Sequence, residues 1–180
     1  MRLLIVRPNP AFGAGFLAVR FVFGLFMAAH GAQKLLGWFG GYGLAGTGGF
    51  FEQLGFRPGK LFAVVASGSE IVGGLLLAVG LFGPFAPALL VAVMTVATFS
   101  VHWQNGMFAT WNGIKVSLMY GAVAFELALT GPGQYSLDTV FGLDALWTEQ
   151  IAWIAVSLGV AGGFANLLLR KITLSGAKPA

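Results

Sequence analysis

Several ionisable residues fall inside long apolar stretches of this sequence. Arg20 and His30 lie in the first stretch, Glu70 in the second and Glu126 in the fourth. A charge surrounded by lipid is costly, so such residues usually pair with one another, bind a ligand or carry protons. Counting residues from the helix ends places Glu70 near the middle of a membrane. A carboxyl group there is suited to proton exchange, because low-dielectric surroundings disfavour its charged form.

Two interpretations of these charges remain open. In the first, Arg20, His30 and Glu70 form a polar pocket that binds a quinone head group or relays protons. In the second, Arg20 and Glu126 lie at matching depth and form a structural ion pair between two helices. Glu70 has no charged residue at quite its own depth and would then be protonated. We expect Lys34 near the membrane surface, where its side chain would extend toward the head groups.

Metal and haem chemistry is weakly supported. The sequence contains no cysteine, which excludes thiolate metal sites, iron–sulfur clusters and a cysteine nucleophile. His30 and His102 fall toward the same end of two parallel helices, which raises the question of a shared b-type haem. Their depths differ by roughly 5–8 Å, which disfavours that pairing. We therefore predict no metal site and no intrinsic cofactor, with a quinone and lipids as the candidate ligands, and the sequence does not identify a catalytic residue.

The composition indicates that lipid covers most of the protein surface. Of the 180 residues, 57% are hydrophobic and only 9% are charged, whereas soluble domains carry about 25% charged residues. The formal net charge is +4, but the basic residues lie at the ends of apolar runs. This distribution is typical of membrane anchoring and does not indicate a nucleic-acid partner.

Five apolar segments approach the length of about 20 residues that a spanning helix requires. They cover residues 12–36, 61–82, 85–103, 114–130 and 150–169. None shows the period-2 alternation of a transmembrane strand. The sequence therefore predicts an all-α membrane protein, a four-helix transmembrane bundle with a fifth transmembrane helix at the C-terminal side.

An aromatic-rich connection follows the first segment. It is interrupted by glycine too often to span a membrane, and we expect it to lie over one end of the bundle at the interface. Its aromatic residues would form either an ordinary interfacial belt or a surface for a partner protein. The residues assigned to this interface loop are Trp38, Phe39, Tyr42, Phe50 and Phe51.

Four motifs occur in order along the chain. The first and second are Arg20, Gly24, His30-Gly31 and Lys34, and then Glu70, Gly73-Gly74, Leu77 and Gly80. The third is Asn112-Gly113. The fourth is the loop Gly131-Pro132-Gly133-Gln134-Tyr135-Ser136-Leu137-Asp138. In this combination the sequence resembles the DoxX family of small bacterial membrane proteins.

The resemblance implies a four-helix core over residues 14–143, preceded by a segment over residues 1–13. Residues 144–180 would add a helix and a basic tail. It also implies a multi-pass protein of the bacterial cytoplasmic membrane. The chain departs from the family at Lys115, where relatives often carry an acidic residue, and in its fifth apolar segment.

The family resemblance leaves three functional hypotheses. The first is an accessory or anchor subunit of a larger, redox-related membrane complex, held by lipid and partner subunits. The second is a quinone-binding subunit of a thiosulfate:quinone-type oxidoreductase, the one form in which we would expect enzymatic activity. The third is a small transporter, which the scarcity of polar residues disfavours.

Overall fold

The computed structural model describes residues 10–176, with side chains up to residue 170. Residues 1–9 of the predicted N-terminal segment and residues 177–180 of the predicted basic tail lie outside this range. Within it every regular element is helical, which confirms the predicted fold class. The α-helices are α1 (Pro10–Leu36), α2 (Gly43–Gln53), α3 (Gly59–Val79), α4 (Phe85–Ala97), α5 (Lys115–Thr130), α6 (Leu137–Phe141) and α7 (Glu149–Gly176).

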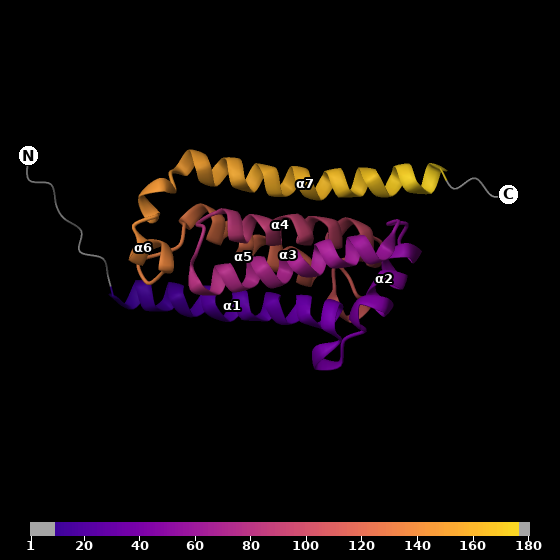
Figure 1. Cartoon of the computed structure of the whole chain (residues 1–180), viewed down its shortest axis with the longest axis horizontal. Helices are drawn as coiled ribbons and strands as arrows, with labels where there is room; N and C mark the ends of the chain where they lie inside the picture. Colours follow the sequence, from indigo (N-terminus) through magenta and orange to yellow (C-terminus); the bar gives the residue numbers. More distant parts are fainter. Residues whose placement is uncertain (1–9, 177–180) are drawn as a thin grey trace, which may run out of the picture.

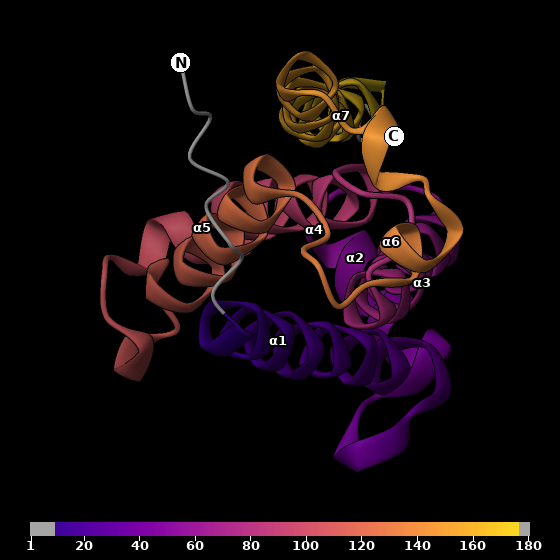
Figure 2. The same cartoon turned by 90° about the vertical axis from the view of Figure 1, so that its left-hand side faces the viewer.

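Five long helices run side by side and alternate in direction (Figure 1). The connections therefore gather at two ends of the bundle. End A holds the start of α1, the turn between α3 and α4, and the short helix α6. End B holds α2 and the connection between α4 and α5. Figures 1 and 2 both place α7 on the side of the bundle opposite α1.

Four of these helices are long and apolar enough to cross a membrane: Pro10–Leu36, Gly59–Val79, Phe85–Asn105 and Glu149–Arg170. The third combines α4 with a π-helical turn (Thr98–His102) and a 3-10 turn (Trp103–Asn105) that continue it directly. The remaining long helix, α5, has 16 residues. At 1.5 Å per residue it is about 24 Å long, shorter than a typical hydrocarbon core.

Glycines bring α1 and α3 into direct backbone contact. A Cβ atom added to Gly24 would overlap the backbone of Gly74 and Ala78, and one added to Gly74 would overlap Gly24 and Ala28. Without a hydrophobic driving force between helices in lipid, small residues allow the close approach that dispersion attraction requires. This contact fixes the register of the two helices that carry Arg20, Lys34 and Glu70.

The interior of the bundle is apolar and so is its outer surface. Met27, Leu90 and Leu127 are fully or almost fully buried at the centre. Large side chains such as Phe26 and Leu158 remain more than half exposed. In water such a surface would be an aggregation hazard. Because Phe26 and Leu158 lie on helices that are long enough to span a membrane, their exposed side chains face the lipid of the bilayer.

Candidate functional site

A partly buried ion pair joins α1 to α3. The Nζ atom of Lys34 lies 2.5 Å from Oε1 of Glu70. Glu70 has no exposed side-chain surface, whereas the Lys34 side chain is 32% exposed. Two expectations are thereby corrected, because Glu70 does have a charged partner and Lys34 points inward.

Side-chain direction explains the pairing. Bonds from Cα to Cβ in a helix tilt toward the N-terminus, so the Lys34 chain extends back along α1 toward the centre of the bundle. The antiparallel register brings Gly31 beside Ser67 and Ile71, which places Glu70 within reach of Lys34. The hydroxyl of Thr47 donates to the backbone carbonyl of Lys34 at 3.0 Å and so links α2 to the same position.

The second carboxylate oxygen of Glu70 differs from the first in its hydrogen bonding. Its Oε2 atom is buried and has no hydrogen-bond partner among the described residues. Buried carboxylate oxygens are normally satisfied, so an unsatisfied one is often found where a ligand or water binds. The carboxylate of Glu70 can therefore accept a further hydrogen bond. The ammonium group of Lys34 has three donors, and Glu70 uses one of them.

Arg20 lies elsewhere in the bundle and does not pair with Glu126. Its guanidinium group donates to the carbonyl oxygens of Pro132 and Tyr135, the latter at 2.7 Å. Glu126 is exposed on α5. The predicted ion pair is therefore wrong: equal depth does not ensure that two side chains face each other, and loop carbonyls at end A accept from both terminal nitrogens of the arginine.

Arg20 is also remote from Glu70. Its guanidinium group packs against Gly80, which lies ten residues after Glu70 and directly follows α3. At 1.5 Å per residue this separation is about 15 Å along the helix. Arg20 and Glu70 were expected to share one polar pocket with His30, but they are thus separated along the bundle.

The motif loop of residues 131–138 closes end A. Asp138 is completely buried and accepts hydrogen bonds from the backbone N–H groups of Phe82 and Gly83 and from the indole of Trp147. Ser136 caps α6 by accepting from the N–H of Thr139. Arg20 and Asp138 together hold the loop, so in this structure the motif is structural. The roles of Asp138 toward the α3–α4 turn and of Trp147 were missed from the sequence.

The two histidines have separate surroundings. His30 shares a hydrogen bond of 2.9 Å with the side chain of Gln33, and its ring lies 6.1 Å from that of Tyr120. His102 lies at end B and contacts the carbonyl oxygen of Asn112 at 2.7 Å. Within residues 10–170 no three potential metal ligands cluster together.

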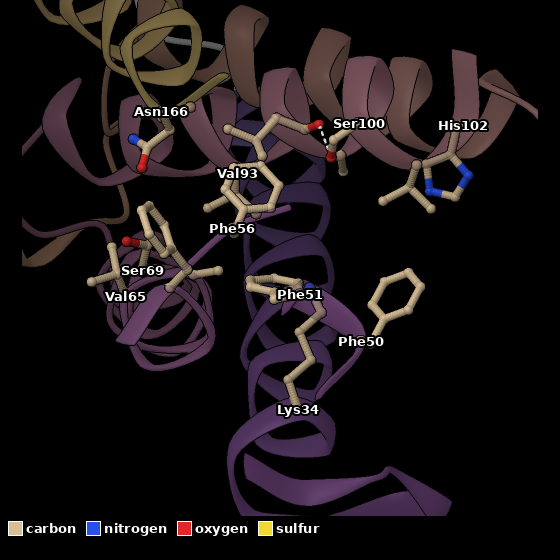
Figure 3. A pocket seen from close by; sticks show the side chains of 16 residues that line it. Lys34, Phe50, Phe51, Phe56, Val65, Ser69, Val93, Ser100, His102 and Asn166 are labelled. Atoms are coloured by element: carbon tan, nitrogen blue, oxygen red, sulfur yellow. Dashed lines mark hydrogen bonds between the residues drawn. The ribbon is translucent and has the colours of Figure 1, made fainter. Parts of the chain in front are cut away.

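The Lys34 side chain points into an apolar cavity of about 230 Å³ (Figure 3). The cavity lies between α2, α3, α4 and α7, and phenylalanine side chains form much of its wall. Phe51, Phe56 and Phe62 follow one another with ring centroids 5.8 and 5.3 Å apart. Polar atoms come from the side chains of Lys34, Ser69, Ser100, His102 and Asn166.

The predicted interface loop is divided between this cavity and the surface. Phe50 and Phe51 lie on α2 and line the cavity. Trp38, Phe39 and Tyr42 point away from the bundle and are 59%, 70% and 87% exposed. The cavity wall also includes Phe56, from the same aromatic-rich connection, and Ser69 and Asn166, which sequence reasoning did not select. Only the density of phenylalanines around α2 could have suggested it.

A second, more polar cavity of about 650 Å³ lies on the other side of α2. His30, Gln33, Tyr42 and Thr47 contribute to its walls. Lys34 lines both cavities. Lys34 therefore borders two cavities near end B, and the second has the larger share of polar atoms in its lining.

The fold and this site define a multi-pass α-helical membrane protein with a charged pair beside an apolar chamber. The DoxX family model matches residues 15–103. The chain belongs to the DoxX family. The matched region contains every residue of the Lys34 cavity except Asn166.

Two relatives from Haemophilus influenzae are similar to this chain, and both are described only as uncharacterized proteins. One is 36% identical over 76 residues, which are 42% of this chain and 50% of the relative. The other is 32% identical over 130 residues, which are 70% of this chain and 90% of the relative. No solved structure matches the chain significantly.

Proposed function

We propose that this protein is a quinone-binding subunit of a redox complex in the bacterial cytoplasmic membrane. The observation that supports the proposal is Lys34, which lines a phenylalanine-rich cavity and forms an ion pair with the buried Glu70 behind it. Ligand pockets are typically apolar with a few placed polar groups. A quinone matches this pattern, because its flat ring is apolar and its two carbonyl oxygens accept hydrogen bonds.

Each part of the head group has a suitable partner. The ammonium group of Lys34 is positioned to donate to a quinone carbonyl while it keeps its bond to Glu70. Phe51 and Phe56 offer ring faces and edges for the quinone ring. The hydroxyl of Ser100 donates to the Val96 carbonyl at 2.7 Å and still has an acceptor site for the hydroxyl of a reduced quinol.

The polar cavity would supply protons. Reduction of a quinone to a quinol takes up two electrons and two protons. In this proposal the electrons come from a redox group on a partner subunit, and the protons arrive from end B through the cavity that holds His30 and Gln33. Lys34 and Glu70 would pass them on, because Lys34 borders both cavities. The chain is then an accessory subunit whose own contribution is the site.

Quinone binding by the purified chain in lipid nanodiscs tests this proposal. The wild-type protein should bind a benzoquinone or a naphthoquinone saturably, and native mass spectrometry should show the retained molecule. Lys34→Met should weaken binding by about tenfold or more, because a charge-assisted hydrogen bond is lost. Lys115→Met removes an exposed lysine at the start of α5 and should bind like the wild type.

Glu70→Gln tests the proton path. In the assembled complex this variant should retain the quinone and its partner subunits but lose quinone-dependent turnover. Glu126→Gln makes the same change at an exposed position and should leave turnover intact. A wild-type protein that binds neither class of quinone would overturn the proposal and leave the role of an anchor subunit.

A further inference from the structure

A second apolar groove runs along the lipid-facing side of the bundle. It has a volume of about 470 Å³ and lies between α3, α4 and α7. Its floor consists of small residues, Ala88 and Ala92 on α4 and Gly159 and Gly162 on α7. At end A the side chains of Phe82 and Phe85 close it. The described walls contain no charged residue.

The packing of α7 creates this groove. α7 packs mainly on α4 and to a smaller extent on α5. A Cβ atom at Gly159 would overlap the backbone of Ala88, and one at Gly163 would overlap Thr95. By contrast, a Cβ atom at Gly162 would meet nothing within 4 Å. Gly162 therefore borders open space although its neighbours are tightly packed.

The groove continues into the Lys34 cavity. Ala92 lines both spaces. On α7 the groove residue Gly162 lies one turn before the cavity residue Asn166, whose side-chain amide donates to the Gly162 carbonyl at 2.9 Å. The two spaces follow α4 and the π-helical turn that continues it, from Phe85 to Ser100, which is about 22 Å at 1.5 Å per residue. These two adjoining spaces have a charged residue, Lys34, at one end and the apolar Phe82 at the other.

We infer that this groove holds the hydrocarbon tail of the quinone whose head group lies beside Lys34. The inference rests on the proposed function and adds that the ligand is a long-tailed quinone. Its support is the continuity with the head-group cavity and the polarity of the path, which matches a molecule with one polar and one apolar end. The groove wall on α7, which lies outside the residues 15–103 that the family model matches, would contact the tail.

Matched quinones with and without a tail test the inference. In nanodiscs the wild-type protein should bind a quinone with a ten-carbon tail more tightly than the same head group without a tail. Gly162→Leu should fill the groove without disturbing the α4–α7 contact. It should weaken binding of the tailed quinone by about tenfold, because the tail loses its van der Waals contacts, and leave the tailless quinone unaffected.

The control is Gly15→Leu, a substitution at an exposed position of α1 that also borders open space. It should leave the binding of both quinones unchanged. If the tail adds no affinity, or if Gly162→Leu weakens both quinones equally or neither, the groove does not hold the tail and the head-group site stands. If excess phospholipid abolishes the additional affinity of the tailed quinone but leaves the binding of the tailless quinone unchanged, the groove is a phospholipid site. That result would overturn the inference. If neither quinone binds, the proposed function and the inference fall together.

Discussion

Asp138 and Gly83 are 55 residues apart in the sequence, yet the carboxylate of one accepts the backbone N–H of the other at 2.6 Å. The same oxygen accepts the indole N–H of Trp147 at 2.7 Å. One buried side chain thus ties the α3–α4 turn to the segment that leads into α7.

Asp138→Asn should destabilise the protein. An amide presents an oxygen on one side only, so its NH2 group must face a backbone or indole N–H. Leaving such a buried donor unsatisfied costs about 1–3 kcal/mol. The apparent Tm in detergent should fall, whereas Asp144→Asn at an exposed position should not change it. Equal Tm values for both variants would show that Asp138 is not a structural anchor.

Arg20→Lys should loosen the motif loop. The guanidinium group bonds two loop carbonyls at once, and a lysine ammonium group lacks that forked geometry. Hydrogen exchange of residues 131–136 should accelerate in the variant. Glu126→Gln should leave the exchange of this loop unchanged, because Glu126 is exposed and makes no ion pair with Arg20. If Glu126→Gln produced the same acceleration, that result would contradict the contacts described here and support an ion pair between Arg20 and Glu126.

Gly24→Ala should impair folding strongly. The added methyl group would overlap the backbone of α3 and force α1 away from it, and the close backbone contact between the two helices would be lost. Gly15→Ala adds the same methyl group in open space on the same helix. The yield of monodisperse protein and the apparent Tm should fall only for Gly24→Ala, and matching behaviour of the two variants would contradict the packing described.

Lys34 and Glu70 should be strongly coupled in stability. Lys34→Met leaves a buried carboxylate without its partner. The cost should be less than the value of about 3–5 kcal/mol that is typical of a fully buried ion pair, because the Lys34 side chain is 32% exposed. The double variant Lys34→Met with Glu70→Gln should recover part of that loss. A double-mutant cycle on unfolding in mild detergent measures the coupling, and additive effects would mean that the pair contributes nothing.

The helices could be predicted because the length of each apolar run, and the glycine and proline residues that separate the runs, are local features of the sequence. Segment 12–36 corresponds to Pro10–Leu36 and segment 114–130 to Lys115–Thr130. The side-chain pairings were harder to predict from the sequence. Depth along a helix can be counted from the sequence, but the rotation of each helix about its axis depends on contacts with its neighbours.

Two charged residues illustrate the difference. Glu126 has a depth that suits Arg20, but α5 is turned so that this carboxylate faces outward. Lys34 has a Cα atom near the end of α1, but its long side chain extends toward the helix N-terminus and reaches Glu70. The cavity was not predictable, since its walls combine residues as distant as Lys34 and Asn166.

The lipid-facing residues on the walls of the cavity and the groove determine how a molecule would reach the site. Val65 on the cavity wall and Leu158 on the groove wall are 52% and 61% exposed on the lipid-facing surface. A ligand that enters there arrives by lateral diffusion within the bilayer and never has to pass through water. Occupancy would then follow the mole fraction of the ligand in the membrane, and its bulk aqueous concentration would have little influence.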